Sequence, residues 1–549
     1  MILTILLIQC TISINCVMAQ NFLKQIQVKV PNRSGEDLSF QHLLTAKPGT
    51  LIPILWHEVI PGTKVFLKSA ISASLPPLAS DTFMRCKLKL EAFFVPFRQL
   101  SAAFSPWLTG EKVYNVVTNA EENAVVPTAV IADVDECGPG SLADYLGFKL
   151  ETIVDPVPVN PYPFLCYHWI WDQMYRNSKI QKRCFSIPSY GADVDDSSYK
   201  AGFIPYINSY SGNPLEIGSK QTYTRLCDGL YLHELRQRNF DVDYFTSSTP
   251  NPQSVVNPAA VSFTVDENGN GQFTISALRA QNSLQQYLER QNLAGFRLTE
   301  YCKANYGVNL SEGLAQMPLF LGRQAIDVYS KGVESTANVA GTTQNPFAGS
   351  TGARYGSAYA IGNDTLIQDF EAKEPGIIMV MASMVPKVTY ATGQDRLLMH
   401  FVSQSSQGDV ANPLLQNVGQ QPIYSQELFA ADTPDIFGYT DRFAEFMCKH
   451  DKVSGLLRDG QSLEAFALQR SFGLSAPHIS SQFIEIPTDY MDQVSAVAGS
   501  ISGYGIWIDS YFEFKISHPL HAYSIPSLQD PAYEHGKGVI INRSGQIVE

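Results

Sequence analysis

The chain has 549 residues, of which 45% are hydrophobic and 17% are charged, and its formal net charge is −13. This balance supports a sizeable buried core and excludes wholesale disorder. No Lys/Arg-rich tail occurs at either end, so the charge also excludes a polycation that wraps nucleic acid over its whole surface. Aromatic residues reach 11%, beside 32 prolines and 38 glycines. Such a mixture favours strands joined by irregular connections, and we predict a mainly β fold.

The first 20 residues, MILTILLIQCTISINCVMAQ, combine an apolar run with a small-residue finish, as a secretory signal peptide does. They lack the basic n-region of such a peptide, and polar residues interrupt the run. Taken alone, these residues leave two interpretations open: an export signal, or an upstream extension with translation starting at Met18.

Four stretches near the two ends of the chain predict strands. In 87–97, Leu88, Leu90, Ala92 and Phe94 share one face, which predicts a half-buried strand that ends near a proline. The other stretches are 50–69, which reads as two strands around a Pro-Gly turn, the buried run 375–390 and the alternating strand 506–516.

The middle of the chain, 121–374, is rich in Asn, Pro, Gly, Ser and Tyr and predicts long insertions. Helices are expected near 162–180 and 276–292, the second with Ser276 as its N-cap. Strands 261–265 and 272–276 predict a hairpin, and 330–364 predicts a long loop.

Sequence motifs give no catalytic, cofactor-binding or metal-binding residues. The string DENGNG (266–271) starts like a calcium loop, but Ala277 stands where the bidentate carboxylate is needed, which favours a hairpin turn. The nine cysteines form no C-x-x-C pair, which argues against a zinc framework and favours free thiols in a reducing compartment. Neither a nucleophile elbow nor a phosphate-binding loop is present.

The string HWIWDQMYRNSKIQKR (168–183) interleaves aromatic and basic residues. Two interpretations are open: a surface that stacks bases and neutralises phosphates of a single strand, or an amphipathic helix with its aromatics in the core and its basic residues in water. Helix geometry alone produces such interleaving and favours the second. The candidate nucleic-acid contacts are Lys179, Lys182 and Arg183.

Several longer strings occur in the order of a known family. They are 51–100, LRQRNFDVDYFTSSTPNPQ (235–253), 284–322, VTYATGQDRLLMHF (388–401), IFGYTDRFAEFMCKHDKVSGLLRDG (436–460) and 511–531. Together they resemble the major capsid protein of microviruses, small tailless phages with circular single-stranded DNA, and in particular its gokushovirus-like branch. Phe437 to Glu445 is the most specific stretch, whereas FMCKHDKVSG and the tail after 531 depart from the family pattern.

The resemblance implies an eight-stranded jelly roll of the viral capsid type with long, partly helical insertions between its strands. It places a discontinuous core at 18–120 and 375–531, insertions at 121–374 with a projecting variable loop at 249–275, and a C-terminal tail at 532–549. It also implies that 1–17 is a non-native extension, with Met18 as the start.

The function implied is structural: self-assembly into a T=1 icosahedral shell around circular single-stranded DNA, without catalysis and without cofactors. The implied partners are copies of the chain, packaged DNA, a small basic DNA-binding protein, a pilot or minor protein and a host surface receptor, with no membrane. The implied location is the virion, assembled in bacterial cytoplasm. The alternatives are a secreted carbohydrate-binding or adhesive β-sandwich protein and a β-rich hydrolase that uses scattered carboxylates.

Overall fold

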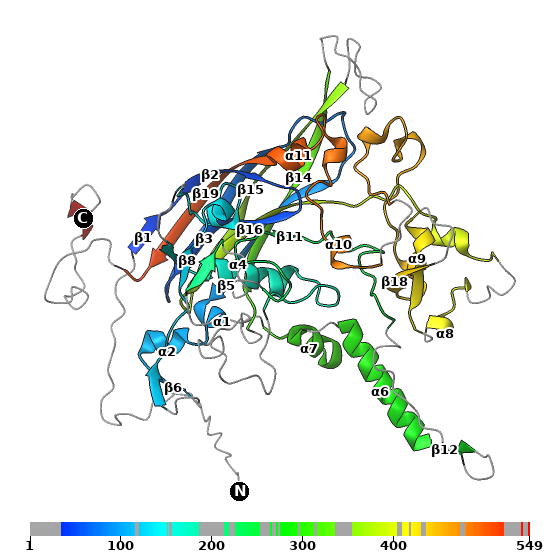
Figure 1. Ribbon diagram of the computed structural model, residues 1–549, viewed down its shortest axis with the longest axis horizontal. Coiled ribbons are helices and arrows are strands. Elements are labelled where there is room, and N and C mark those ends of the chain that lie inside the picture. Colours follow the sequence, from blue (N-terminus) through cyan, green and yellow to red (C-terminus); the bar gives the residue numbers. More distant parts are fainter. Residues whose placement is uncertain are drawn as a thin grey trace, which may run out of the picture. The chain divides into compact units, whose positions relative to one another are not determined.

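The computed structural model describes residues 34–115, 120–150, 152, 156–185, 214–218, 226–252, 264–265, 271–272, 275–294, 297–311, 316–334, 354–402, 409–416, 419–429, 435–472, 478–520, 540–541 and 547–548 (Figure 1). The chain divides into two compact units, residues 1–35 with 517–549, and residues 36–516. In the first unit, β20 (Ile540–Ile541) pairs with β21 (Ile547–Val548). The predicted extension 1–17 lies outside the described residues.

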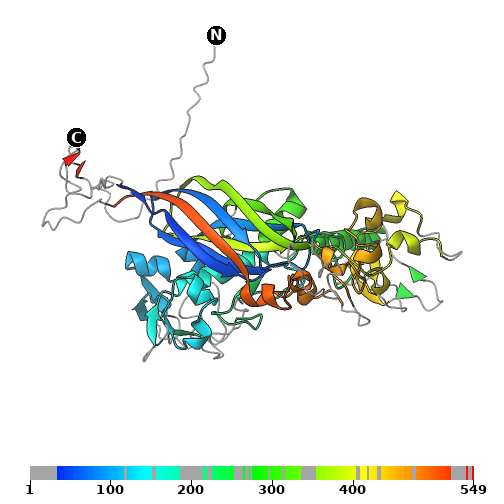
Figure 2. The same cartoon turned by 90° about the horizontal axis from the view of Figure 1, so that it is seen from above.

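The larger unit is built on a ten-stranded sheet, so the prediction of a mainly β fold is confirmed. Its order is β1-β19-β4-β15-β14-β5-β16-β3-β11, and β2 also pairs with β19. Strands from the two ends of the chain lie side by side, as the blue and orange-red arrows of Figures 1 and 2 show. The strands are β1 (Ser34–Asp37), β2 (Phe40–Ala46), β3 (Thr50–Val59), β4 (Lys64–Ser74), β5 (Cys86–Pro96), β11 (Arg236–Gln237), β14 (Leu319–Glu334), β15 (Arg354–Glu371), β16 (Gly376–Pro386) and β19 (Ile506–His518).

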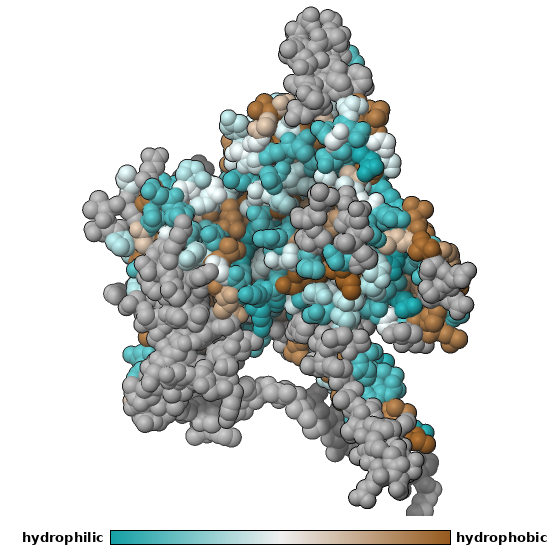
Figure 3. All heavy atoms as spheres, turned by 45° about the vertical axis from the view of Figure 1, so that its right-hand side comes forward, coloured by the Kyte–Doolittle hydropathy of each residue, from teal (hydrophilic) through white to brown (hydrophobic). Residues whose placement is uncertain are grey.

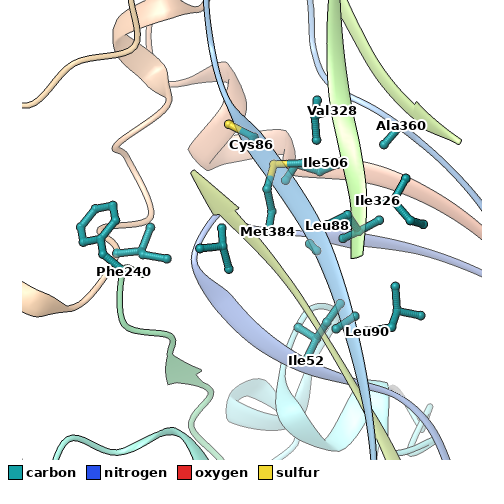
Figure 4. Packing of buried hydrophobic residues seen from close by; sticks show 14 of the residues in the cluster. Ile52, Cys86, Leu88, Leu90, Phe240, Ile326, Val328, Ala360, Met384 and Ile506 are labelled. Atoms are coloured by element: carbon teal, nitrogen blue, oxygen red, sulfur yellow. The ribbon is translucent and has the colours of Figure 1, made fainter. Parts of the chain in front are cut away.

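Strand β14 joins two layers of this sheet. Its first part, Leu319 to Val328, pairs with β5, and its last part, Tyr329 to Glu334, pairs with β15. Apolar side chains from both layers meet in one core, in which Leu88 and Met384 of one layer lie near Ala360 and Ile506 of the other (Figure 4). We call β3-β16-β5-β14 the covered sheet and β2-β19-β4-β15 the open sheet.

The open sheet shows the alternation that the sequence predicts. On β19, Ile506, Ile508 and Phe512 are buried, whereas Trp507 and Tyr511 are exposed. The two strands predicted around the Pro-Gly turn are present as β3 and β4. The predicted strands are thus confirmed, and β4 and β19 alternate because a strand that faces one core needs apolar residues only at every second position.

The prediction that 87–97 forms a half-buried strand is wrong, because β5 is buried on both faces. A second apolar core covers the outer face of β5 and β16, with Phe93, Val95 and Met379 on the sheet side. The covering helices are α1 (Phe97–Leu100), α3 (Leu142–Tyr145) and α4 (Tyr162–Ile170). A strand that lies between two layers of protein has no face in contact with water, whatever its pattern of polar and apolar residues.

The remaining strands form small sheets. The three-stranded sheet β10-β8-β9 contains β8 (Ala129–Ile131), β9 (Val157–Val159) and β10 (Leu215–Ile217). The two-stranded pairs are β6 (Lys112–Asn115) with β7 (Ala120–Asn123), β12 (Thr264–Val265) with β13 (Gly271–Gln272), and β17 (Gln421–Tyr424) with β18 (Ile436–Thr440).

The other helices and helical turns are α2 (Phe104–Thr109), η1 (Asp135–Cys137), η2 (Trp171–Tyr175), α6 (Ile275–Ala294), α7 (Leu298–Tyr306), η4 (Arg396–Met399), α8 (Pro413–Gln416), η6 (Ser425–Glu427), α9 (Ala444–Met447), η7 (Gly455–Leu457), η8 (Glu464–Phe466), α10 (Ser481–Ile484), η9 (Asp492–Val494) and α11 (Ser500–Tyr504). In the part of the chain that is described, no helix has the length and apolar character that crossing a membrane requires.

Three predictions in the middle segment are corrected in part. Helix α6 is present, but it begins at Ile275, so Ser276 lies inside the helix and is not its N-cap. The hairpin exists as β12 and β13, and its predicted second strand ends earlier because 275–276 belong to α6. The predicted loop 330–364 is wrong at both ends, since β14 extends to Glu334 and β15 starts at Arg354. These two ends pair with each other in the sheet. Because their outward-facing side chains are exposed, their sequence pattern resembles that of a loop.

Candidate nucleic-acid interface

The predicted helix over 162–180 is helical only to Tyr175. Helix α4 is buried along its whole length, because its aromatic and aliphatic residues pack on the covered sheet, and η2 continues it with a wider π-type turn. The chain leaves the helix at Arg176, whose backbone is extended. The candidate contacts therefore lie on the irregular segment that follows η2 and not on a helix face.

The aromatic residues of this segment are not available to stack bases. Trp169 and Trp171 are buried, and their indole N–H groups donate to Gln99 Oε1 at 3.2 Å and to the carbonyl of Gln237 at 2.9 Å. A buried indole with a satisfied N–H is typical of a core position. The stacking interpretation is wrong for both tryptophans, and they belong to the core as the alternative interpretation expects.

Asp172 is the centre around which the basic residues gather. Its carboxylate is buried, and it accepts from the backbone N–H of Cys184 at 3.0 Å and from Gln173 Nε2 at 2.8 Å. Arg176 Nε lies 3.0 Å from Oδ1, and Arg183 Nε lies 3.8 Å from Oδ2. Arg176 is itself buried, so the expectation that the basic residues point into water fails at this position.

The three candidate residues differ in how far they reach solvent. Lys182 is exposed, and the Arg183 side chain keeps 43% of its surface while it pairs with Asp172. Lys179 is half-buried, and burial lowers the pKa of its ammonium group, an effect that the charges of Glu300 and Asp441 oppose. Lys182 and Arg183 are thus the better placed of the three for an exposed anion.

Two further arginines, which the sequence analysis did not single out, lie beside Lys179. A hollow of about 460 Å³ is lined by Lys179, Arg238 and Arg297 together with Asn177 and Asn239. Arg297 donates from Nη2 to the carbonyls of Asp172 and Arg176 at 3.1 and 2.7 Å, which ties the start of α7 to the end of η2. The sequence does contain a pattern that could have pointed to Arg238. In the string LRQRNFD, Arg236 and Arg238 are two positions apart, at the start of the short strand β11 and directly after its end.

Arg238 belongs to a buried charged network on the outer face of β5. Its Nη1 donates to Glu91 Oε2 at 2.6 Å, and Tyr175 donates its hydroxyl to the same oxygen at 2.6 Å. Burial alone would raise the pKa of Glu91, but the charge of Arg238 and these hydrogen bonds hold it below its ordinary value. Burial next to this carboxylate raises the pKa of Tyr175 well above its ordinary value. Lys89 Nζ completes the network with Asp241 Oδ1 at 2.6 Å.

The buried charges of this arrangement are paired with one another. Each buried carboxylate described above is matched by a cation and by hydrogen bonds, which is typical of a structural network. Among the residues that the structure describes, no group of His, Cys, Asp and Glu could hold a metal ion. The seven described cysteines are free thiols. The described residues thus form a layered β-rich body whose buried charges are paired.

The comparisons with known proteins place the chain in a family of structural proteins. The pattern of the family described as "Capsid protein (F protein)" matches residues 24–528, so the chain belongs to that family. The resemblance to the capsid proteins of microviruses is thereby confirmed. The chain is a capsid protein and not an enzyme, and it is a component of the virion.

Three relatives are similar over nearly their whole length, and each is named capsid protein VP1. The protein of Chlamydia phage 1 is 25% identical, over 93% of this chain and 98% of the relative. The protein of Bdellovibrio phage phiMH2K is 23% identical, over 92% and 98%, and that of Spiroplasma virus 4 is 24% identical, over 88% and 92%. These matches favour neither the secreted β-sandwich nor the hydrolase.

Proposed function

We propose that the chain is an eight-stranded jelly roll that assembles with its own copies into a T=1 icosahedral shell around circular single-stranded DNA. The strand pairing carries this proposal. Four antiparallel pairs are nested in the sequence: β2 with β19, β3 with β16, β4 with β15, and β5 with β14. Such nesting describes one long hairpin rolled into two facing sheets, which is the arrangement of jelly rolls in viral capsids.

The same pairing supports a discontinuous core with insertions. The first four strands of the nest end at Pro96, and the return strands begin at Leu319. The core at 18–120 and 375–531 therefore also recruits β14 and β15 from the segment 121–374, while the rest of that segment supplies the layer over β5. The projecting loop at 249–275 and the tail at 532–549 stay predictions.

Assembly is tested by expressing the full chain and imaging the product. Uniform icosahedral particles are the expected result, because a closed shell requires each subunit to present complementary surfaces to several neighbours. A monodisperse monomer across a range of salt concentrations would count against the proposal. Mass spectrometry of the N-terminus addresses the secreted alternative: cleavage before Gln20 supports export, and a start at Met18 or Ala19 supports a capsid subunit assembled in bacterial cytoplasm.

Contacts to the packaged DNA are proposed at Lys179, Lys182 and Arg183. Replacing all three with Ala should lower the DNA content of purified particles and weaken its salt dependence, because fewer phosphates are neutralised. Shell formation should persist. The matched control is the charge-conserving variant Lys179→Arg, Lys182→Arg, Arg183→Lys, which should package normally. Unchanged DNA content in the Ala variant would remove these residues from the interface.

The net charge of −13 supports the participation of other components. A shell of acidic subunits repels DNA over long distances, so a small basic DNA-binding protein would share the neutralisation. A pilot or minor protein and a host surface receptor are the remaining proposed partners. Pull-down of the assembled particle, followed by identification of the proteins bound in fixed ratio, tests these three.

A further inference from the structure

A second hollow lies beside the one that contains Lys179, on the outer face of β5 and β14. It has a volume of about 500 Å³, and all of its lining residues belong to the described part of the chain. Tyr175 and Arg238 line both hollows, so the two hollows adjoin each other. On the face that Figure 3 shows, brown hydrophobic side chains lie among teal hydrophilic ones, so an exposed apolar group alone does not single out a site. The second hollow is distinguished by the two residues that β14 contributes to it.

A shift in the strand pairing places these two residues, Phe320 and Arg323, on the same face of β14. Phe320 pairs with Phe93 of β5, and Arg323 pairs with Glu91, which is only two positions from Phe93. The register therefore shifts by one residue between the two pairs, as in a β-bulge. On a regular strand, residues three positions apart point to opposite faces. Because of the shift, Phe320 and Arg323 instead both line the hollow on the outer face.

Both side chains are accessible to a ligand. Phe320 is 41% exposed, and its ring packs edge-on against Phe93 with 5.7 Å between the ring centroids, so the sheet holds one part of the ring and solvent reaches another. Arg323 is exposed, and within the described part of the chain its guanidinium group has neither an ion pair nor a hydrogen bond. Arg238 differs, because Glu91 neutralises its charge. Arg323 therefore gives the hollow a positive charge that no other side chain of the hollow neutralises.

We propose that this hollow holds one nucleotide of a single-stranded nucleic acid, with its base stacked on Phe320 and its phosphate paired with Arg323. The proposal rests on the proposed packaging of single-stranded DNA. An accessible aromatic ring beside a cation is the combination with which proteins bind single strands of any sequence, because every base has a face that can stack and every nucleotide carries a phosphate. A guanidinium group also matches the geometry of a phosphate. Since the hollow adjoins the one that contains Lys179, a strand bound here continues toward the DNA contacts proposed above.

The test compares the binding of two fluorescent oligomers of equal length to the full chain in solution: oligo-dT and an oligomer of abasic sites. Both carry the same phosphates, but only oligo-dT has bases that can stack. Phe320→Ala should lower the affinity for oligo-dT about fivefold or more and leave the affinity for the abasic oligomer unchanged. Arg323→Ala should weaken the binding of both oligomers. It should also reduce the slope of log affinity against log salt concentration by about 0.7, as expected when one phosphate contact to a single strand is lost.

The matched controls are Phe83→Ala and Arg85→Ala, which remove an exposed Phe and an exposed Arg just before the other end of β5. Neither should change the affinity for either oligomer. If Phe320→Ala binds both oligomers as the wild type does, the inference is wrong. This includes the outcome in which that variant fails only to form particles, since the ring would then contact another protein. If the wild-type chain binds the oligomers as expected but forms no particles, the shell function is wrong and the nucleotide site stands.

Discussion

The two sheets of the larger unit have the same strand chemistry but different surroundings. On the open sheet, β4 and β19 alternate between buried apolar and exposed residues. On the covered sheet, β5 and β16 are buried on both faces, one against the core between the sheets and the other against the layer that contains α4. The charged residues Lys89 and Glu91 of β5 are therefore buried, although charged residues on a strand usually face water.

This difference shows what the insertion between β5 and β14 contributes. It supplies Arg238, Tyr175 and Asp241, the partners that compensate for the burial of Glu91 and Lys89. Without these partners, Glu91 and Lys89 would be buried with charges that nothing compensates. Burying an uncompensated charge costs a large desolvation free energy. The covered sheet and its insertion thus depend on each other, whereas the open sheet needs only its one core.

Neighbouring residues on one strand give the sharpest test of the comparison. On the covered sheet, Phe93→Ala and Phe94→Ala should each lower the free energy of unfolding by about 3–5 kcal/mol, because the two rings fill cores on opposite faces. On the open sheet, Phe512→Ala should cost the same, but Tyr511→Ala only about 0.5 kcal/mol. Urea unfolding of the four variants measures this. Equal effects for Phe512 and Tyr511 would contradict the exposure of the open sheet.

A smaller effect is expected from the ion pairs of the two sheets. Glu91→Gln should lower the free energy of unfolding by about 3 kcal/mol, because Arg238 is left buried without its counter-charge. The control Glu513→Gln, which removes the exposed pair with Lys515 on β19, should produce no measurable change. Comparable losses in the two variants would show that the layer over β5 does not exclude water.

The same carboxylate predicts a pH dependence. The pKa of Glu91 is held below its ordinary value of 4.5 in the folded chain, so the unfolded chain binds more protons in this range and stability rises with pH. The contribution is fully present above the ordinary pKa and is lost as the pH falls through the folded pKa. Unfolding measured between about pH 5 and pH 3 should therefore show a shallower pH dependence for Glu91→Gln than for wild type. Parallel curves would contradict the assignment.

The smallest effect concerns the place where the two sheets approach each other. A Cβ at Gly322 of β14 would lie 1.9 Å from the carbonyl oxygen of Leu366 on β15, so Gly322→Ala should cost about 1–3 kcal/mol. The control Gly503→Ala, where a Cβ meets nothing within 4 Å, should be neutral or slightly stabilising. Thermal unfolding of the two variants measures this difference in stability. A neutral Gly322→Ala would mean that the strands can separate without cost.

The candidate interface was only partly predictable from the sequence. The run after 168 does carry basic residues, but Arg176 turns inward to Asp172, and Trp169 and Trp171 fill the core. Arg297, more than a hundred residues later, completes the surroundings of Lys179. Spacing within one segment cannot reveal which charges find partners from another segment, because pairing is decided by tertiary proximity.

The sequence by itself determined where β3, β4 and β19 run and which side chains of β19 face the core, because alternation with a period of two is a local property of the chain. Its ordered strings also determined the capsid family. Only the tertiary structure decided that β5 is buried on both faces, that 330–334 and 354–364 are strands, and that Phe320 and Arg323 share a face of β14. These features depend on layers and pairings built from distant segments, and no local pattern encodes the presence of a second layer.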